Sequence, residues 1–336
     1  MTKTIYKPRT HNRFLLLPIV FLSNVWSTYP RIKHITIRIN VQIFLLCLLC
    51  PGYTNAQDTV AANSTSFNIK IATWNIQMLP TCFAFFTKDF RKKQRVRAPW
   101  IIEYCNSHKY DVIVFQEVFD KNIKKKLERE LKVFYPYQVN PRKKPGSLLS
   151  NGILIVSRVP MKYIDHIFFE QGTHADKWAS KGCTLVEIEK NRIKFQIAGT
   201  HLQSSNTKKA VVHRIKQYQA IRSLLENNIN IHVPLFVLGD MNTPKSNKVN
   251  YLKMLNKIGV KDVELNEKKP YTIDSINYWN PHQENRQLDY ILIHSNNTSS
   301  KIKKQKIIRP KNKFKEAQMD LSDHYGIVAE IEIVND

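Results

Sequence analysis

Leu321-Ser322-Asp323-His324-Tyr325-Gly326 lies close to the end of the chain, and an alternating apolar run over residues 327–333 follows it at once. Such alternation predicts a strand with one buried face. A histidine beside a carboxylate at the mouth of a strand is a place where a general base is often found. The stretch therefore predicts a hydrolytic site built at the ends of strands, and other segments of the chain supply matching partners.

Strand-like and helix-like runs alternate from Phe67 onward, and no repeat of fixed period is present. In the run 208–227 the apolar residues recur at spacings of three and four, which places them on one helix face. This mixture predicts an α/β layered domain with mixed sheets rather than a TIM barrel. The predicted strands are 67–74, 111–116, 152–157, 183–189, 193–199, 234–239, 287–293 and 326–333, and the predicted helices are 91–107, 121–133, 208–227 and 247–257.

The first 56 residues read as a leader rather than as part of the fold. Two units of basic residues followed by an apolar run occur there, and each run is far below the roughly 20 residues of a membrane-spanning helix. The small residues 54–56 resemble a signal-peptidase site. We therefore predict an export signal over 1–56, cleavage after Ala56 and a secreted protein, with a membrane-tethered form as the alternative. Residues 57–66 read as a linker, and residues 67–336 as a single catalytic domain.

The charge of the chain belongs to its folded part as well as to its leader. Residues 57–336 hold 45 of the 52 Lys and Arg and all 27 Asp and Glu, a net charge of +18. Such a surface attracts polyanions, either nucleic acid or an anionic membrane, although a basic proteome or a solubility device gives the same composition. Cys82, Cys105 and Cys183 show no metal-ligand spacing, so we predict free thiols and at most one disulfide.

Polar side chains stand at the ends of several predicted strands. Asp240 and Asn242 follow an apolar run and would project to the same side if the extended backbone continued, although Asp-x-Asn before proline is also a common turn signature. Glu117 ends another apolar run with a hard oxygen ligand suited to Mg²⁺. His201 ends a third strand, and Asp289 begins a fourth.

The chemistry of these residues suggests a role for each. Neighbouring side chains of an extended segment point apart, so Asp323 is poorly placed to orient His324, and we expect Asp289 to fix its tautomer. Glu117 would hold a divalent cation that polarises a phosphoryl oxygen. His201 and Asn242 can donate hydrogen bonds to the transition state. Asp240 can position the water or carry a proton to the leaving oxygen. Together they predict metal-assisted hydrolysis of a phosphate ester.

In their order along the chain, six segments resemble the endonuclease/exonuclease/phosphatase superfamily. Within it, Leu79-Pro80 and Val118-Phe119-Asp120 favour secreted bacterial neutral sphingomyelinases over nucleases. The six segments are Asn75-x-Gln77, Gln116-Glu117, Gly199-Thr200-His201-Leu202, Gly239-Asp240-Met241-Asn242, Leu288-Asp289-Tyr290 and Ser322-Asp323-His324.

The resemblance implies a DNase I-like, four-layer α/β sandwich with two mixed β-sheets flanked by helices. It also implies Mg²⁺ dependence, with Mn²⁺ or Co²⁺ as alternatives, and hydrolysis of membrane sphingomyelin or a related phospholipid by a monomer. Sphingomyelin would yield ceramide and phosphocholine. The metal would be bound by Glu117 with Asn75 beside it, and Asp323 would face the same region. The catalytic positions would be His324 as general base, His201 and Asn242 as transition-state donors, Asp240 as proton or water handler, and Asp289 as the partner of the base.

The sequence departs from the secreted sphingomyelinases at two places. Leu149, Ser150 and Asn151 replace acidic residues of a second, edge metal site, which we therefore predict to be absent. Where the family inserts a hairpin with exposed aromatic residues, this chain has Lys301–Lys315, with eight basic residues in fifteen and one aromatic, Phe314. Two interpretations stay open: adsorption to anionic lipid, at about 1 kcal/mol for each base, or a solvated loop.

Two other functions compete with this one. The basic charge would also suit a DNase-like nuclease, and another phospholipase C of the same superfamily fits the same motifs. Nucleic acid is a partner only if the protein is a nuclease. The chain lacks the Asn-Gly-x-Arg start that is typical of abasic-site endonucleases. A binding module without catalysis is disfavoured, because all the expected catalytic positions are filled.

Overall fold

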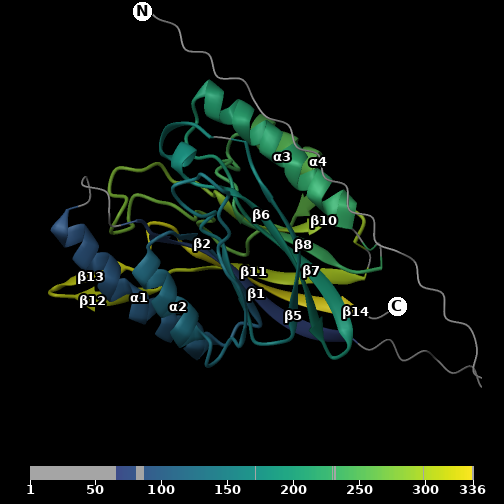
Figure 1. Cartoon of the computed structure of the whole chain (residues 1–336), viewed down its shortest axis with the longest axis horizontal. Helices are drawn as coiled ribbons and strands as arrows, with labels where there is room; N and C mark the ends of the chain where they lie inside the picture. The colour runs from purple at the N-terminus through teal and green to yellow at the C-terminus, as the bar shows by residue number, and fades with distance from the viewer. Residues whose placement is uncertain are drawn as a thin grey trace, which may run out of the picture. The chain divides into compact units, whose positions relative to one another are not determined.

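Two six-stranded mixed sheets face each other at the centre of the molecule (Figure 1). The computed structural model describes residues 66–80, 87–170, 172–228, 230, 232–297 and 299–334, so the predicted leader and Cys82 lie outside the described residues. The first sheet has the order β11-β14-β1-β2-β4-β3 and the second the order β5-β6-β7-β8-β10-β9.

The strands of the first sheet are β1 (Ser66–Met78), β2 (Val112–Val118), β3 (Tyr137–Val139), β4 (Leu154–Ser157), β11 (Ser300–Ile308) and β14 (Gly326–Val334). Those of the second are β5 (Met161–Phe168), β6 (Gly182–Lys190), β7 (Ile193–His201), β8 (Leu235–Asp240), β9 (Val260–Asp262) and β10 (Asp289–His294). A separate hairpin joins β12 (Lys311–Phe314) to β13 (Ala317–Asp320), and a short 3₁₀ helix, η1, spans His174–Trp178.

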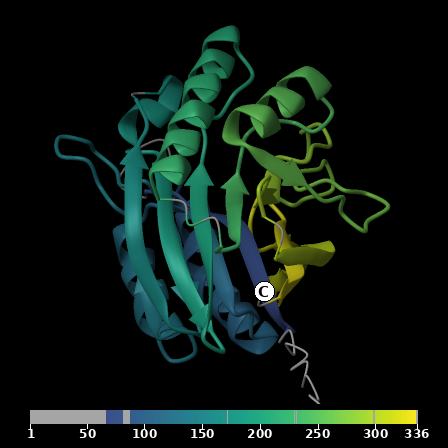
Figure 2. The same ribbon diagram turned by 90° about the vertical axis from the view of Figure 1, so that its right-hand side faces the viewer.

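Helices cover the outer face of each sheet. The helices α1 (Lys88–His108) and α2 (Lys121–Leu131) pack against the first sheet. The second sheet is covered by α3 (Lys208–Asn228) and α4 (Lys248–Ile258), and the two views of Figures 1 and 2 show the two pairs on opposite sides. A cluster of buried side chains, mainly Ile, Val, Leu and Phe, fills the space between the sheets. The prediction of a four-layer α/β sandwich is confirmed.

All eight predicted strands and all four predicted helices are present, with ends that differ by a few residues. The interpretation of Lys301–Lys315 as a solvated loop is wrong. The first half of this segment belongs to β11, an edge strand that pairs antiparallel with β14, and its second half forms β12 of the hairpin. An edge strand needs only one buried face, so Ile302 and Ile307 turn inward while lysines occupy the solvent side.

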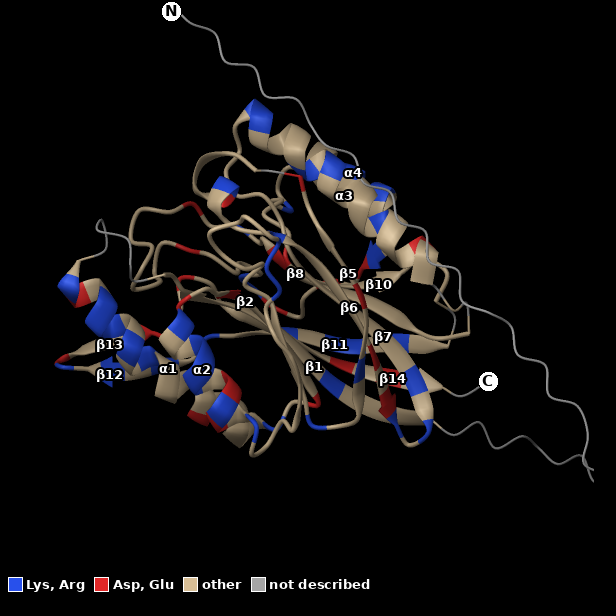
Figure 3. Cartoon of the chain, viewed as in Figure 1, with Lys and Arg blue, Asp and Glu red and all other residues tan. Residues whose placement is uncertain are grey.

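The described residues include no helix that is long and apolar enough to cross a membrane. Cys105 and Cys183 are buried free thiols, as predicted for these two residues. Burial raises the pKa of both thiols, so neither is poised to react at neutral pH. Lys and Arg are spread over the helices and strands rather than gathered in one place (Figure 3).

Candidate active site

Strand pairing brings three of the predicted catalytic residues to one level of the second sheet. The strands β7 and β8 are parallel with His201 opposite Asp240, and the antiparallel β10 places Asp289 opposite the same Asp240. The strands approach closely at Gly239, which has φ +149°, and a Cβ there would lie 1.9 Å from the carbonyl oxygen of Thr200. Only glycine permits this register, so it helps to set the geometry of the site.

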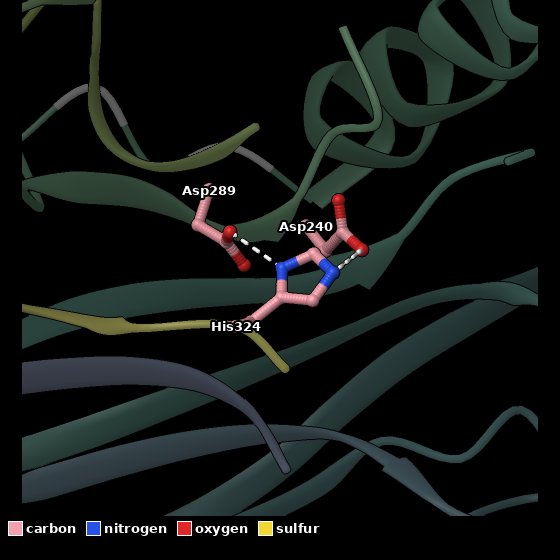
Figure 4. Close-up of side chains that lie close together, drawn as sticks. All are labelled: Asp240, Asp289 and His324. Carbon is pink, nitrogen blue, oxygen red and sulfur yellow. Dashed lines mark hydrogen bonds and ion pairs between the residues drawn. The ribbon is translucent and has the colours of Figure 1, made fainter. Parts of the chain in front are cut away.

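His324 reaches these residues from the first sheet. Its Nδ1 lies 2.8 Å from Oδ2 of Asp289, and its Nε2 lies 3.8 Å from Oδ2 of Asp240 (Figure 4). Burial alone would lower the pKa of His324, but the negative charges of Asp289 and Asp240 and the hydrogen bond from Nδ1 raise it well above the ordinary value. The structure thus places Asp289, rather than the adjacent Asp323, against the imidazole.

Asn75 connects the two sheets across the site. Its Nδ2 donates to Oε1 of Glu117 at 3.0 Å and to Oδ2 of Asp240 at 3.2 Å, while its Oδ1 accepts from the backbone nitrogen of Gln77 at 3.2 Å. The hydroxyl of Ser322 donates to the carbonyl oxygen of Asn75 at 2.7 Å. The ends of β1, β2 and β8 and the segment before β14 are therefore linked by hydrogen bonds.

Glu117 is partly open to solvent, with 19% of its side chain accessible. Burial raises its pKa to about 7, and the negative charge of Asp323 adds to the effect. Asp323 is also partly exposed, and its Oδ1 lies 3.2 Å from the hydroxyl of Ser322. The structure therefore brings Glu117, Asn75 and Asp323 into one region.

His201 has a partner that the sequence did not reveal. Its Nε2 lies 3.4 Å from Oδ2 of Asp240 and 3.0 Å from Nζ of Lys181, which is buried and also contacts Oδ1 of Asp176 at 2.8 Å. Burial and the positive charge of Lys181 lower the pKa of His201 well below the ordinary value. His201 is therefore neutral and accepts at Nε2 in this arrangement, so Lys181 is the positive hydrogen-bond donor beside it.

Asn242 lies in the turn that its sequence left open as the alternative to an extended backbone. The strand β8 ends at Asp240, and Asn242 has φ +48°, so the extended backbone does not continue. Instead the backbone nitrogen of Asn242 donates to Oδ1 of Asp240 at 2.9 Å, the turn that Asp-x-Asn favours, and its Nδ2 donates to the carbonyl oxygen of Leu202 at 3.1 Å. The left-handed backbone recurs at Gln77 (φ +49°) and Glu117 (φ +59°), a clustering typical of functional sites.

Arg97, on α1, is a second residue that sequence reasoning missed. It is fully buried and donates to the carbonyl oxygens of Leu321 at 2.7 Å, Gln77 at 2.9 Å and Ile76 at 3.3 Å. Its guanidinium lies 4.6 Å from the ring centroid of Trp279. Burial lowers its pKa to about 10, so it stays charged. Arg97 fastens the end of β1 to the segment that carries His324.

The donor set fits a divalent cation such as Mg²⁺. Glu117 and Asp323 offer hard carboxylate oxygens. A cation would stabilise the ionised form of Glu117, which burial and the negative charge of Asp323 otherwise disfavour. Asn75 turns its amide nitrogen toward Glu117, so ligation by its Oδ1 requires rotation of the amide. Ligand-type atoms of Asp240, Asp289 and His324 also lie within 4.8 Å of one another. The 2.8 Å hydrogen bond between His324 and Asp289 accounts for one of these contacts.

Known proteins similar in sequence to this chain include a sphingomyelinase and a phospholipase C. Sphingomyelinase C of Leptospira interrogans is 32% identical over 225 residues, which cover 61% of this chain but only 40% of that protein. The chain thus spans about two fifths of the length of this relative. Phospholipase C of Staphylococcus aureus is 26% identical over 84% of this chain and 93% of its own length.

A solved structure shows the same fold. A double mutant of beta toxin from Staphylococcus aureus with bound magnesium ions superposes with a TM-score of 0.68 at 24% identity and covers 78% of this chain and 99% of that one. The model of the Endonuclease/Exonuclease/phosphatase family matches residues 72–324. These residues include every side chain predicted for the site, from Asn75 to His324. The chain belongs to the endonuclease/exonuclease/phosphatase family.

Proposed function

We propose that this protein is a metal-dependent phosphodiesterase that hydrolyses sphingomyelin to ceramide and phosphocholine. The observation that carries the proposal is the pairing of His324 Nδ1 with Asp289 at 2.8 Å in a buried site shared with Asp240. Because Nδ1 donates to Asp289, Nε2 is the nitrogen that can take a proton from water. Similarity to sphingomyelinases and a phospholipase C supports the choice of a phospholipid substrate.

In the proposed reaction His324 Nε2 accepts a proton from a water molecule, whose oxygen forms a bond to phosphorus. The bond between phosphorus and the ceramide oxygen breaks, and that oxygen receives a proton that is replaced from solvent. Asp240, 3.8 Å from Nε2, orients the water or passes the proton to the leaving oxygen. Asn242 acts as a hydrogen-bond donor to the transition state, and Lys181, whose three hydrogens are taken by His201, Leu202 and Asp176, adds positive charge nearby. The donor role of His201 requires that its Nε2 carry a proton in place of the contact with Lys181.

Glu117, with Asn75 and Asp323 beside it, would hold the divalent cation. When bound, the cation polarises a phosphoryl oxygen and offsets the charge that develops there. We expect Mg²⁺, with Mn²⁺ and Co²⁺ as substitutes. The bound cation would also favour the ionised form of Glu117 and the neutral form of His324, since a positive charge nearby stabilises carboxylates and destabilises imidazolium.

A nuclease of the same family is the second candidate, because the net charge of +18 on residues 57–336 attracts phosphate polymers. The test is a parallel assay with Mg²⁺ or with a chelator on sphingomyelin, phosphatidylcholine, lysophospholipids and plasmid DNA. We expect Mg²⁺-dependent release of phosphocholine from sphingomyelin. Cleavage of DNA alone would overturn the proposal in favour of the nuclease.

The His324→Ala variant tests the mechanism separately. Loss of a positioned general base lowers the rate by about 10²–10⁴-fold, so we expect a loss of this size on whichever substrate is cleaved. Near-full activity of the variant would contradict the assigned base.

Secretion is a further part of the proposal, supported by the leader pattern of residues 1–56. Amino-terminal sequencing of protein recovered from the culture medium should give Gln57 as the first residue. An intact amino terminus in the membrane fraction would instead support the tethered form.

A further inference from the structure

Two large apolar side chains are exposed next to each other at the rim of the candidate site. Leu148 is 51% and Trp178 is 48% accessible, although both are residues that normally bury most of their surface. Their backbones run side by side, because the nitrogen of Leu149 donates to the carbonyl oxygen of Trp178 at 2.9 Å and Leu149 forms a bridge with Ala179. The pair therefore forms one small apolar patch, which we call the Leu148/Trp178 patch.

Two separate connections fix this patch to the catalytic centre. Three residues after Trp178, the side chain of Lys181 contacts Nε2 of His201 at 3.0 Å. Four residues after Leu148, the carbonyl oxygen of Gly152 accepts from the backbone nitrogen of Val118 at 3.0 Å, one residue from Glu117. The two segments that carry the patch therefore lead to His201 and Glu117, whose Nε2 and Oε1 lie 3.9 Å apart.

The support beneath Trp178 is polar and buried. Asp176 of η1 accepts at Oδ2 from the backbone nitrogen and the hydroxyl of Ser204, at 2.7 and 2.8 Å, and from Nε2 of Gln203 at 2.7 Å. Its Oδ1 contacts Lys181 at 2.8 Å. A side chain held outward on such a support does not have to become ordered when it meets a partner, which lowers the entropic cost of binding.

Positive charge surrounds the Leu148/Trp178 patch. Lys143, Lys144 and Lys177 are exposed, and Nζ of Lys177 lies 4.9 Å from the ring centroid of Trp178. Residues 140–150 contain no acidic side chain. An apolar centre with tryptophan, bordered by lysines, matches the interface of a phospholipid bilayer, where acyl chains lie beneath a layer of phosphates.

We propose that the Leu148/Trp178 patch docks the protein on a phospholipid membrane, with Trp178 and Leu148 entering the interfacial region and the three lysines meeting lipid phosphates. This inference rests on the proposed function, because only a lipid substrate requires such an orientation of the site. The turn of the hairpin β12–β13 consists of Lys315 and Glu316, and Phe314 beside it is only partly exposed. The large exposed apolar side chains therefore lie at a different edge of the site.

The test measures binding without turnover. All variants are made in the His324→Ala background and mixed with vesicles of phosphatidylcholine and sphingomyelin, with and without phosphatidylserine, and the bound fraction is measured by co-sedimentation. We expect Leu148→Ser with Trp178→Ser to lower the partition coefficient at least about tenfold. We expect Lys143, Lys144 and Lys177 changed to Gln to weaken binding mainly to the vesicles with phosphatidylserine and to flatten its dependence on salt.

Val133→Ser with Phe134→Ser is the matched control. These residues are 78% and 46% exposed and precede β3. Tyr137 of β3 pairs with Ser157 of β4, which pairs with Val112 at the start of β2, at the other end of this strand from Glu117. This control should bind like the parent. Equal binding of the Leu148/Trp178 double variant and the parent would overturn the docking proposal.

Two further results separate the alternatives. A concentration-dependent dimer in light scattering that the double variant abolishes would assign the patch to a second copy of this chain and overturn docking on lipid. Vesicle binding that depends on the patch, combined with cleavage of DNA but no phospholipid by the parent with His324 intact, would overturn the proposed substrate while leaving the membrane contact in place.

Discussion

At the scale of single residues, the direction of each hydrogen bond decides which atoms can react. His324 donates from Nδ1 to Asp289, so Nε2 faces Asp240 and is the nitrogen that accepts a proton once the imidazole is neutral. His201 accepts at Nε2 from Lys181 and is neutral. Two histidines of one site therefore differ in charge, because one faces two carboxylates and the other a buried ammonium group.

Asp289→Asn should move the acidic limb of the pH–activity profile to lower pH. The negative charges of Asp289 and Asp240 raise the pKa of His324, so the neutral base forms only at higher pH in the wild type. Asparagine keeps an oxygen that accepts from Nδ1 but lacks the charge, so the base loses its proton at lower pH. Profiles of kcat/KM against pH measure this, with Asp165→Asn on β5 as control. An unchanged or higher acidic limb would contradict the assigned pair.

Mg²⁺ affinity should fall as the pH drops below 7. Burial and Asp323 raise the pKa of Glu117 to about 7, and a protonated carboxylate must release its proton before it binds a metal. Between pH 8 and pH 6 we expect an affinity loss of up to about tenfold. Isothermal titration calorimetry at both values measures it. In Glu117→Gln both the binding and its pH dependence should disappear, and a residual pH dependence would point to another ligand.

Sequence reasoning found the residues of the site that stand at strand ends and missed those that support them. Asp240 and His201 follow apolar runs, so their place at a sheet edge was predictable. Arg97 lies within a helix that has many other bases, where the pattern indicates a solvent-facing charge. Lys181 precedes β6 in a segment without periodicity, so nothing in the sequence indicated that its side chain is buried against His201.

At the scale of elements, α1 does more than cover the first sheet. Arg97 extends from this helix to carbonyl oxygens at the end of β1 and in the segment before His324. Removing the guanidinium leaves these three carbonyl groups without this donor. Each buried carbonyl group left unsatisfied lowers the stability of the protein by about 1–3 kcal/mol. Arg97 therefore contributes to the stability of the fold and to the position of the segment that carries His324.

Arg97→Met should therefore lower the free energy of unfolding by about 3 kcal/mol or more and lower kcat even where the protein remains folded. Urea denaturation and a steady-state assay measure the two effects. Arg95→Met is the matched control, because Arg95 is exposed on the same helix and should change neither quantity by more than about 0.5 kcal/mol. Equal stability of the two variants would show that the three hydrogen bonds contribute nothing.

The hairpin and the edge strand divide the basic segment Lys301–Lys315 into two parts with different surroundings. Lys303 of β11 pairs with Glu332 at 3.1 Å, and Lys304 stands opposite Glu330, so acidic residues of β14 offset the charge of this part. In the hairpin Lys311 pairs with Asp320 and Lys313 with Glu316, both at 3.5 Å, but the start of α1 lies nearby and adds exposed bases of its own.

Changing Lys311, Lys313 and Lys315 to Gln should weaken binding to vesicles with phosphatidylserine, whereas changing Lys301, Lys304 and Lys306 to Gln should have a smaller effect. Each base near an anionic surface contributes about 1 kcal/mol. Both groups of lysines have acidic neighbours, but only the hairpin lies near the exposed bases at the start of α1, which add to the attraction of an anionic surface. Co-sedimentation at two salt concentrations compares the two triple variants, which remove the same charge. Equal losses would indicate binding through net charge alone.

The same segment shows why strand prediction failed at the edges of the sheets. Central strands such as β8 are buried on both faces and read as apolar runs in the sequence. In β11 the run Lys303-Lys304-Gln305-Lys306 separates Ile302 from Ile307, and the bulge between Ile302 and Lys304 breaks the alternation. Charged side chains on an edge strand prevent it from pairing with other chains. The same charges interrupt the apolar pattern from which a strand is predicted.

At the scale of the whole molecule, the site exists only because two sheets end at the same edge. The first sheet supplies Asn75 and Glu117, the second supplies His201, Asp240 and Asp289, and His324 arrives from the segment before β14. The order of the elements indicated the layers. The contacts across the layers, such as the 3.2 Å hydrogen bond from Asn75 to Asp240, depend on how the sheets pack, which no local pattern encodes.

The burial of Glu117, with Asp323 beside it, favours catalysis at the expense of stability. Its pKa in the folded protein, about 7, lies above the ordinary 4.5, so ionisation costs stability that grows as the pH rises through this range. Glu117→Gln should therefore raise the melting temperature of the metal-free protein at pH 8 but hardly at pH 4.5, and calorimetry would show a pH-independent difference if this account is wrong. Selection for heat resistance alone would favour the inactive variant.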